Sequence, residues 1–122
     1  MNKLITVVIL MFLASCQTQQ PQNVNARPDM KELINDSETV LVDVRVPEQF
    51  EKNTAKGAIN IPLAEIEEHA TELKGKKVVL FCNTGRQAGQ ALDILKKVGH
   101  DNVYSGVSVF NIQALQKESN DK

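Results

Sequence analysis

Cys82 is the residue of this sequence best placed to do chemistry. It lies in the stretch FCNTGRQAG at residues 81–89, between an apolar run and apolar residues at helical spacing. Where a buried strand leads through a short loop into a helix, backbone N–H groups converge on a common anion site. A cysteine attacks as its thiolate, and N–H donors stabilise that charged form. The stretch therefore predicts a nucleophilic cysteine that needs no histidine as a general base.

The alternative is a buried structural cysteine, since cysteine is among the most buried residue types. Three features favour the reactive cysteine: Gly85 in the loop, the helix that follows at once, and the adjacent Arg86. Arg86 would add positive charge near the sulfur only if its side chain turned inward. The sequence leaves that orientation open.

Apolar runs around this stretch predict the strands that position it. Continuous apolar residues at 40–42 and 78–81 indicate strands buried on both faces, as in a parallel sheet. Shorter extended segments are expected at 58–61 and 102–104.

Apolar residues at helical spacing predict four helices. They are expected from Pro28, from Pro62 to Leu73, from Arg86 to Val98 and from Ser108 to about Gln116. Gly99 is expected to cap the third helix. Alternating strands and helices predict one α/β domain over residues 28–118, with a small, mainly parallel sheet flanked by helices.

Composition argues against several classes of function. The chain has 122 residues, a formal net charge of −1, one Tyr and no Trp. It therefore lacks the basic surface and the aromatic platforms that bind nucleic acid. His69 and His100 are isolated, and with one available cysteine they offer no zinc-binding spacing. We therefore expect no zinc site, and a monomer is the default expectation.

The N-terminal residues resemble an export signal. Lys3 precedes an apolar run, residues 4–14, that is too short to span a bilayer, because a spanning helix needs about 20 residues. The run ends in LASC at residues 13–16, which resembles the lipobox of bacterial lipoproteins. This resemblance implies that residues 1–15 are a cleaved lipoprotein signal peptide and that Cys16 is lipidated.

Residues 16–27 would then be the lipidated Cys16 and a flexible polar tether to a bacterial membrane. Gln17 stands where an Asp would retain a lipoprotein in the inner membrane. In a cell with two membranes, the resemblance therefore favours the outer membrane, with the domain facing the periplasm or the cell exterior. The alternatives are an ordinary signal peptide with an incidental cysteine, or an uncleaved signal anchor.

Three blocks of the sequence resemble a single-domain rhodanese, and within that family the small exported phage-shock type. They are VDVRVPEQF at residues 42–50, KGAINIPL at 56–63 and CNTGRQAGQA at 82–91. The blocks occur in the family's order and together cover most of the domain.

The resemblance implies a rhodanese-like fold and a sulfurtransferase that uses neither a metal nor an organic cofactor. Cys82 would be the catalytic nucleophile, in a six-residue loop whose amides surround its sulfur. It would attack the outer sulfur of thiosulfate or a similar donor, release sulfite, and pass the persulfide to an acceptor such as cyanide or a thiol. The residues implied to bind the anionic substrate are Asn83, Thr84, Gly85, Arg86 and Gln87.

The sequence departs from the family's pattern in three places. The basic residue of the loop is Arg86, as in the phage-shock group, whereas the common rhodanese loop has it at the position of Gln87. The histidine usual before the block at Gly57 is missing. A Gly-Gly pair near the end is replaced by Gly106-Val107. Val107 could narrow the entrance to the pocket, so the natural substrate is left open.

Two functions are alternatives to the sulfurtransferase. A phosphatase or arsenate-reductase relative is disfavoured, because its Arg would stand six positions after Cys82, where this chain has Ala88. A non-enzymatic persulfide carrier or interaction module is compatible with the intact cysteine. Asp43 and Arg45, at the end of the first expected strand, are interpreted as a structural salt bridge rather than as pocket residues.

Overall fold

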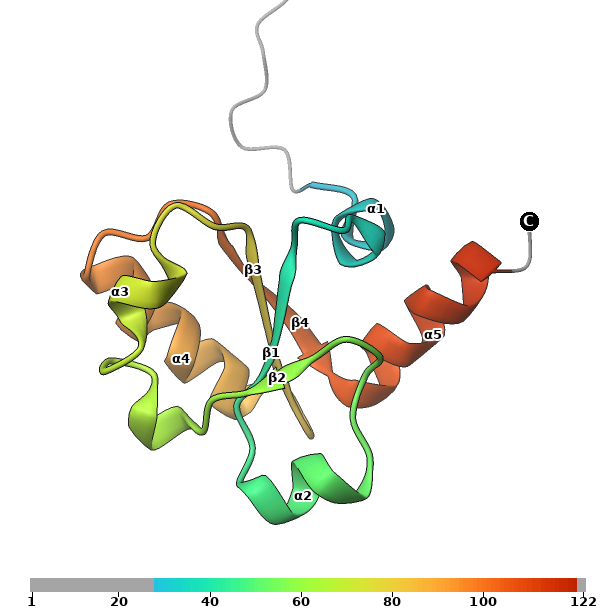
Figure 1. Cartoon of the computed structure of the whole chain (residues 1–122), viewed down its shortest axis with the longest axis horizontal. Coiled ribbons are helices and arrows are strands. Elements are labelled where there is room, and N and C mark those ends of the chain that lie inside the picture. Colours follow the sequence, from blue (N-terminus) through green and yellow to red (C-terminus); the bar gives the residue numbers. More distant parts are fainter. Residues whose placement is uncertain (1–27, 121–122) are drawn as a thin grey trace, which may run out of the picture.

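The chain folds around one sheet of four parallel strands (Figure 1). The computed structural model describes residues 28–120, so the predicted signal peptide, the tether and Cys16 lie outside the described residues. The order of strands across the sheet is β2-β1-β3-β4. Their bounds are β1 Val40–Asp43, β2 Ile59–Asn60, β3 Val78–Cys82 and β4 Val103–Ser108. The predicted α/β class and parallel sheet are confirmed.

Helices cover both faces of this sheet (Figure 1). Their bounds are α1 Met30–Asn35, α2 Pro47–Lys52, the 3-10 helix η2 Leu63–Glu65, α3 Ala70–Leu73, α4 Arg86–Lys97 and α5 Val109–Asn120. The buried residues of α3 and α4 belong to one apolar core, together with Ile66 after η2. Those of α1 and the start of α5 belong to a second core on the opposite face.

β3 is central and buried on both faces, which explains its unbroken apolar sequence. Its residues alternate between the two cores, and Cys82 lies in the core that contains α4. Full burial of an aliphatic or aromatic side chain stabilises the fold by about 1.5–3 kcal/mol. Just before the strand, the Lys77 ammonium hydrogen-bonds the carboxylate of Asp36, which lowers the pKa of Asp36 and raises that of Lys77. These contacts fix the strand that ends in Cys82.

α4 begins and ends close to where the sequence predicts. Its buried residues Ala88, Ala91 and Leu95 are spaced three and four apart, so they share one side of the helix. Gly99, with a φ of +96°, follows the C-cap Val98. It takes the left-handed conformation that glycine adopts readily after a helix.

The predicted continuous helix from Pro62 to Leu73 is wrong. The segment contains η2 and the short α3, with turns between them. Hydrogen bonds to a residue three positions back, such as Glu65 N–H to the Pro62 carbonyl, tighten its start into a 3-10 conformation. The inward-facing positions are nevertheless confirmed at Ile66, Ala70 and Leu73.

The apolar pattern of the sequence does not predict α2. None of its residues is buried, so it has no apolar stripe to reveal it. Pro47 in its first turn and Lys52 in its last turn are the local signals that would have indicated a short helix here.

β4 extends beyond the predicted segment 102–104 and contains a β-bulge. Leu80 pairs with Ser105 but Phe81 pairs with Val107, so Gly106 has no partner on β3. A Cβ at Gly106 would overlap Ile112 Cδ1 and lie 2.8 Å from Val79 Cγ1, so only glycine fits without displacing its neighbours. The bulge directs the chain at Val107 toward the end of β3.

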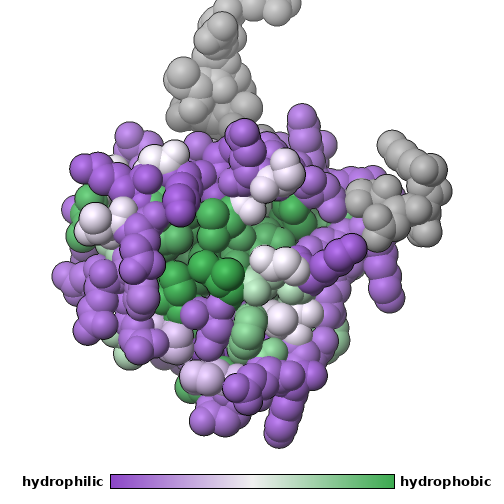
Figure 2. Space-filling model, in the orientation of Figure 1, coloured by the Kyte–Doolittle hydropathy of each residue, from purple (hydrophilic) through white to green (hydrophobic). Residues whose placement is uncertain are grey.

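The edge of the sheet is only partly covered. β2 pairs with Val42 and Asp43 of β1, and leaves the first half of β1 without a strand partner on that side. Figure 2 shows apolar side chains reaching the surface in the region of β1 and β2, surrounded by polar residues. Across residues 28–120, no helix has both the length and the apolar character needed to cross a membrane.

Candidate active site

Cys82 is the last residue of β3, at the carboxyl end of the sheet, where parallel α/β sheets bind ligands. Its side chain is almost fully buried, with 1% of the residue exposed. The Gly85 N–H donates a hydrogen bond to Cys82 Sγ at 3.0 Å. Gly85 has a φ of +95° and is the N-cap of α4. Glycine adopts this left-handed conformation without strain, so the loop can turn its amide back onto the sulfur.

A carbonyl group faces the same sulfur from β4. The Val107 oxygen lies 3.7 Å from Cys82 Sγ, in position to accept a weak hydrogen bond from the protonated thiol. The Gly85 amide stabilises negative charge on the sulfur, whereas the Val107 carbonyl favours a sulfur that keeps its proton. The sulfur therefore lies between one backbone donor and one backbone acceptor.

Cys82 Sγ accepts hydrogen bonds from fewer backbone amides than we predicted for the six-residue loop. Among the described residues, Gly85 supplies the one backbone N–H that bonds to Sγ. The Arg86 N–H instead bonds to Thr84 Oγ1 at 3.4 Å. The predicted contact with the sulfur is therefore seen for the Gly85 amide, and the roles of the other loop amides stay predictions.

The other loop residues surround the mouth of the site. The exposed ones are Asn83, Thr84, Arg86 and Gln87. In the described part of the chain, the Arg86 side chain has no hydrogen bond or ion pair, so it is free to reorient. The catalytic role of Cys82 and the substrate-binding roles of these residues stay predictions.

A buried ion pair supports the loop from β1. Arg45 contacts Asp43 through two atoms, with Nε 3.0 Å from Oδ1 and Nη2 2.8 Å from Oδ2. Both residues are buried, Asp43 fully and Arg45 to 6% exposure. Thr54 adds a hydroxyl hydrogen bond to Asp43 Oδ2 at 2.8 Å. The structural interpretation of Asp43 and Arg45 is confirmed.

The ion pair also reaches the first residue of the loop, which the sequence analysis missed. Arg45 Nη1 donates to Asn83 Oδ1 at 3.0 Å, and Asn83 Nδ2 donates to Gln49 Oε1 of α2 at 3.3 Å. Asn83 is therefore held between β1 and α2, next to Cys82. Asp43 and Arg45 stood out in the sequence as charges at a strand end, but nothing there indicated that their partner is Asn83.

Val107, like Asn83, lies at the mouth of the site. The sequence did not reveal its backbone conformation. With a φ of +71°, it is the single non-glycine residue in the left-handed region among residues 28–120. For an L-residue this conformation costs about 1–2 kcal/mol. A Cβ placed on Gly85 would lie 2.9 Å from Val107 Cγ1, which shows how closely the valine packs on the loop. The side chain is nonetheless 46% exposed.

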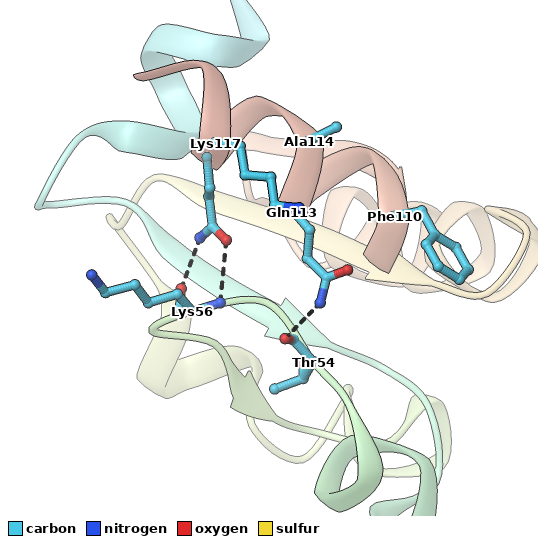
Figure 3. A pocket seen from close by; sticks show the side chains of 7 residues that line it. Thr54, Lys56, Phe110, Gln113, Ala114 and Lys117 are labelled. Carbon is cyan, nitrogen blue, oxygen red and sulfur yellow. Dashed lines mark hydrogen bonds between the residues drawn. The ribbon is translucent and has the colours of Figure 1, made fainter. Parts of the chain in front are cut away.

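A separate groove lies between α5 and the segment before β2 (Figure 3). Its volume is about 600 Å³, and it is lined by Thr54, Lys56, Phe110, Gln113, Ala114, Gln116 and Lys117. Gln113 and Gln116 cross it with amide hydrogen bonds to the carbonyls of Thr54 and Lys56. The loop at residues 82–87 contributes no lining residue, so this groove is distinct from the mouth at Cys82.

The two histidines are used for packing and surface contacts. His100, which follows Gly99, is buried, and its Nε2 lies 2.8 Å from the Ala70 carbonyl oxygen, so it anchors α3. His69 is half-buried and contacts Glu72, which raises the pKa of His69. Within residues 28–120, no three His, Cys, Asp or Glu side chains are grouped as metal ligands.

Replacing Arg45 tests whether the ion pair holds this end of the sheet. Arg45→Met leaves the buried Asp43 charge without its partner, and should lower the free energy of unfolding by about 3–5 kcal/mol. Urea denaturation measures the change. The control is Lys52→Met on exposed α2, which should change stability by less than about 0.5 kcal/mol. An Arg45→Met effect no larger than the control's would contradict a stabilising role for the pair.

A scan against protein families matches residues 26–106 to the rhodanese-like domain. Over 65 residues, the chain is 48% identical to the thiosulfate sulfurtransferase PspE of Escherichia coli K12, covering 51% of this chain and 62% of that protein. Over 103 residues, it is 29% identical to the putative sulfur carrier protein YrkF of Bacillus subtilis, covering 79% of this chain and 56% of YrkF. The chain therefore spans less than two thirds of the length of both relatives.

Solved structures agree with this match. The chain is similar to a rhodanese with anions from E. coli, with a TM-score of 0.57 and 42% identity, over 60% of this chain and 89% of that one. A human single-domain sulfurtransferase, TSTD1, aligns with a TM-score of 0.55 and 25% identity, over 62% of this chain and 80% of that one. The chain belongs to the rhodanese-like domain family, and its four-stranded parallel sheet with helices on both faces is the rhodanese fold.

Proposed function

We propose that this protein is a sulfurtransferase that carries a sulfane sulfur as a persulfide on Cys82. The observation that carries the proposal is the Gly85 N–H directed at Cys82 Sγ, at the carboxyl end of the central strand. A donor fixed at this position stabilises the attacking thiolate, and also stabilises the same sulfur when it leaves as a thiolate in the second step. Similarity to a thiosulfate sulfurtransferase supports the same reaction class.

Thiosulfate is the proposed donor. The Cys82 thiolate attacks the outer sulfur of thiosulfate, and a new S–S bond forms. The S–S bond of thiosulfate breaks, and sulfite leaves with the electron pair. An acceptor such as cyanide or a thiolate then attacks the outer sulfur of the persulfide, and the Cys82 thiolate leaves. No net oxidant or reductant is required.

The exposed loop residues have a proposed role in holding the anionic donor. Arg86 supplies a positive charge at the mouth, and its side chain is exposed. The polar side chains of Asn83, Thr84 and Gln87 would contact the sulfonate oxygens of thiosulfate. Asn83 is restrained by Arg45 and Gln49, so it is the least mobile of these contacts.

A persulfide carrier is the second candidate, favoured by the similarity to the putative sulfur carrier YrkF. Both functions form the persulfide, and they differ in whether small acceptors discharge it repeatedly. Many turnovers per Cys82 support the enzyme, whereas one equivalent of product per Cys82 supports the carrier.

Cys82→Ser tests the nucleophile. Purified wild-type protein should convert thiosulfate and cyanide into thiocyanate and sulfite, and Cys82→Ser should fall to the uncatalysed rate because a serine hydroxyl is a much weaker nucleophile. Mass spectrometry after thiosulfate treatment should show one added sulfur atom on the Cys82 peptide. Thiocyanate formation that survives in Cys82→Ser would refute the assignment of Cys82.

Arg86→Ala tests electrostatic binding of the donor. Loss of one charge-assisted contact worth about 1.4 kcal/mol should raise the KM for thiosulfate about tenfold. The effect should weaken as salt concentration rises. Lys96→Ala, at the far end of the same helix, is the matched control and should leave KM unchanged. Equal KM values for Arg86→Ala and wild type would show that Arg86 does not contact the donor.

We also propose that the protein is exported and lipid-anchored through Cys16. The short apolar run and the LASC sequence at residues 13–16 support this proposal. Gln17 supports the outer membrane in a cell that has two membranes, with the domain facing the periplasm or the exterior.

Cys16→Ser tests the anchor. In a bacterial host that processes lipoproteins, the wild-type chain should incorporate labelled palmitate and fractionate with membranes, because buried acyl chains hold it there. Cys16→Ser should lose both properties. Retention of the label in Cys16→Ser would rule out lipidation at this residue.

A further inference from the structure

Val107 reaches the reactive sulfur because of the bulge in β4. The register shift leaves Gly106 unpaired and places Val107 opposite Phe81, one residue before Cys82. Gly106 is locked between Ile112 and Val79, since a side chain there would overlap both. The bulge therefore cannot slide along the strand without breaking this packing. It holds the Val107 carbonyl 3.7 Å from Cys82 Sγ and presses the valine side chain onto Gly85.

The position of Val107 matters because Cys82 has little open surface. Only 1% of the residue is exposed, and its inner side is closed by the core that contains α4. We take the approach of a reactant to be between Val107 and the loop at residues 83–86, because these segments contact the sulfur and contain exposed residues. The Val107 side chain borders this approach, with Cγ1 packed against Gly85. A strained backbone conformation in a β-branched residue beside a reactive group is a reason to ask what the side chain does.

We propose that Val107 selects the reactants of Cys82 by their width, a step that rests on the proposed sulfur transfer. Slim reacting groups pass the valine: the outer sulfur of thiosulfate, cyanide, and the sulfur of an unbranched primary thiol. Reactants with a branched or aromatic group one or two bonds from the reacting sulfur react more slowly. A glycine at position 107 would relieve the backbone strain and open the entrance. The valine therefore destabilises the fold slightly, and we attribute its presence to selectivity for narrow reactants.

Two thiosulfonate donors separate the effect of donor width from the effect of the sulfur-transfer reaction itself. Methanethiosulfonate and benzenethiosulfonate both carry an outer sulfane sulfur, which the Cys82 thiolate attacks. A cysteine S–S bond forms, the donor S–S bond breaks, and a sulfinate leaves with the electron pair. The donors differ mainly in the group attached to the sulfonyl sulfur, so the ratio of their kcat/KM values reports how much width the entrance admits.

Val107→Ala is the principal variant, because it removes both γ-methyl groups but remains an L-residue at the same backbone position. The ratio of kcat/KM for benzenethiosulfonate to that for methanethiosulfonate should rise about tenfold or more, as expected when a pocket gains the volume of one or two methyl groups. Val107→Gly should raise it at least as much, and Val107→Ile should lower it. Val98→Ala is the matched control: Val98 is 47% exposed, but it follows α4 at the other end of that helix. The ratio of the two kcat/KM values for Val98→Ala should equal that of wild type.

A second readout does not depend on sulfur transfer. In the full chain, Cys82 is alkylated with N-methylmaleimide or N-phenylmaleimide, and the product is quantified on the Cys82 peptide. Val107→Ala should raise the rate with the phenyl reagent relative to the methyl reagent. If no donor transfers sulfur but this alkylation ratio rises, the proposed function fails and the selection by width stands. If neither ratio changes in a folded Val107→Ala variant, Val107 does not control access and the inference is wrong.

Discussion

The candidate site depends on a single backbone hydrogen bond to a sulfur atom. Gly85 donates to Cys82 Sγ because a left-handed glycine turns the loop back on itself before α4 begins. The strand that carries the cysteine is fixed by two apolar cores, so the sulfur does not move to meet the donor. A rigid acceptor and a rigid donor therefore meet without reorganisation. That is the condition under which a hydrogen bond stabilises a charge that forms during a reaction.

The same sulfur also meets a carbonyl, and this distinguishes the site from a simple anion cradle. The Val107 oxygen accepts from the thiol only while the thiol retains its proton. Loss of the proton leaves the carbonyl dipole facing a negative sulfur, which opposes the effect of the Gly85 amide. The loop before α4 thus presents a donor to the sulfur, and β4 presents an acceptor. The bulge at Gly106 determines how near the carbonyl lies.

The loop is supported by the ion pair of Arg45 and Asp43, which makes no hydrogen bond to the sulfur. Arg45 uses its planar guanidinium to bind Asp43 through two atoms and Asn83 through a third nitrogen. A buried pair of this kind is costly to break, because either partner alone would be left as an unpaired charge. Its contribution to the site is therefore indirect: it restrains the residue next to Cys82 and ties the loop to β1 and α2.

The sequence alone determined the fold class, the central strands, α4 and the position of Cys82 at the end of a buried strand. These features depend on local patterns: unbroken apolar runs mark β1 and β3, apolar spacing of three and four marks α4, and Gly99 marks its end. The same reasoning predicted a continuous helix at residues 62–73, because inward-facing residues recur at similar spacing in 3-10 turns. It missed α2, which buries no residue and so leaves no apolar pattern.

Only the tertiary structure decided which groups meet at the sulfur. Gly85 was visible in the sequence as part of the loop, but the hydrogen bond from the Arg86 amide to Thr84 Oγ1 was not. Val107 lies 25 positions from Cys82 in sequence, and Asn83 lies 38 from Arg45. These contacts depend on strand register, on one bulge and on a side chain's reach, which are set by packing between segments distant in the chain. Local periodicity carries no record of them, so the sequence indicated Cys82 as the candidate nucleophile while the fold determined its surroundings.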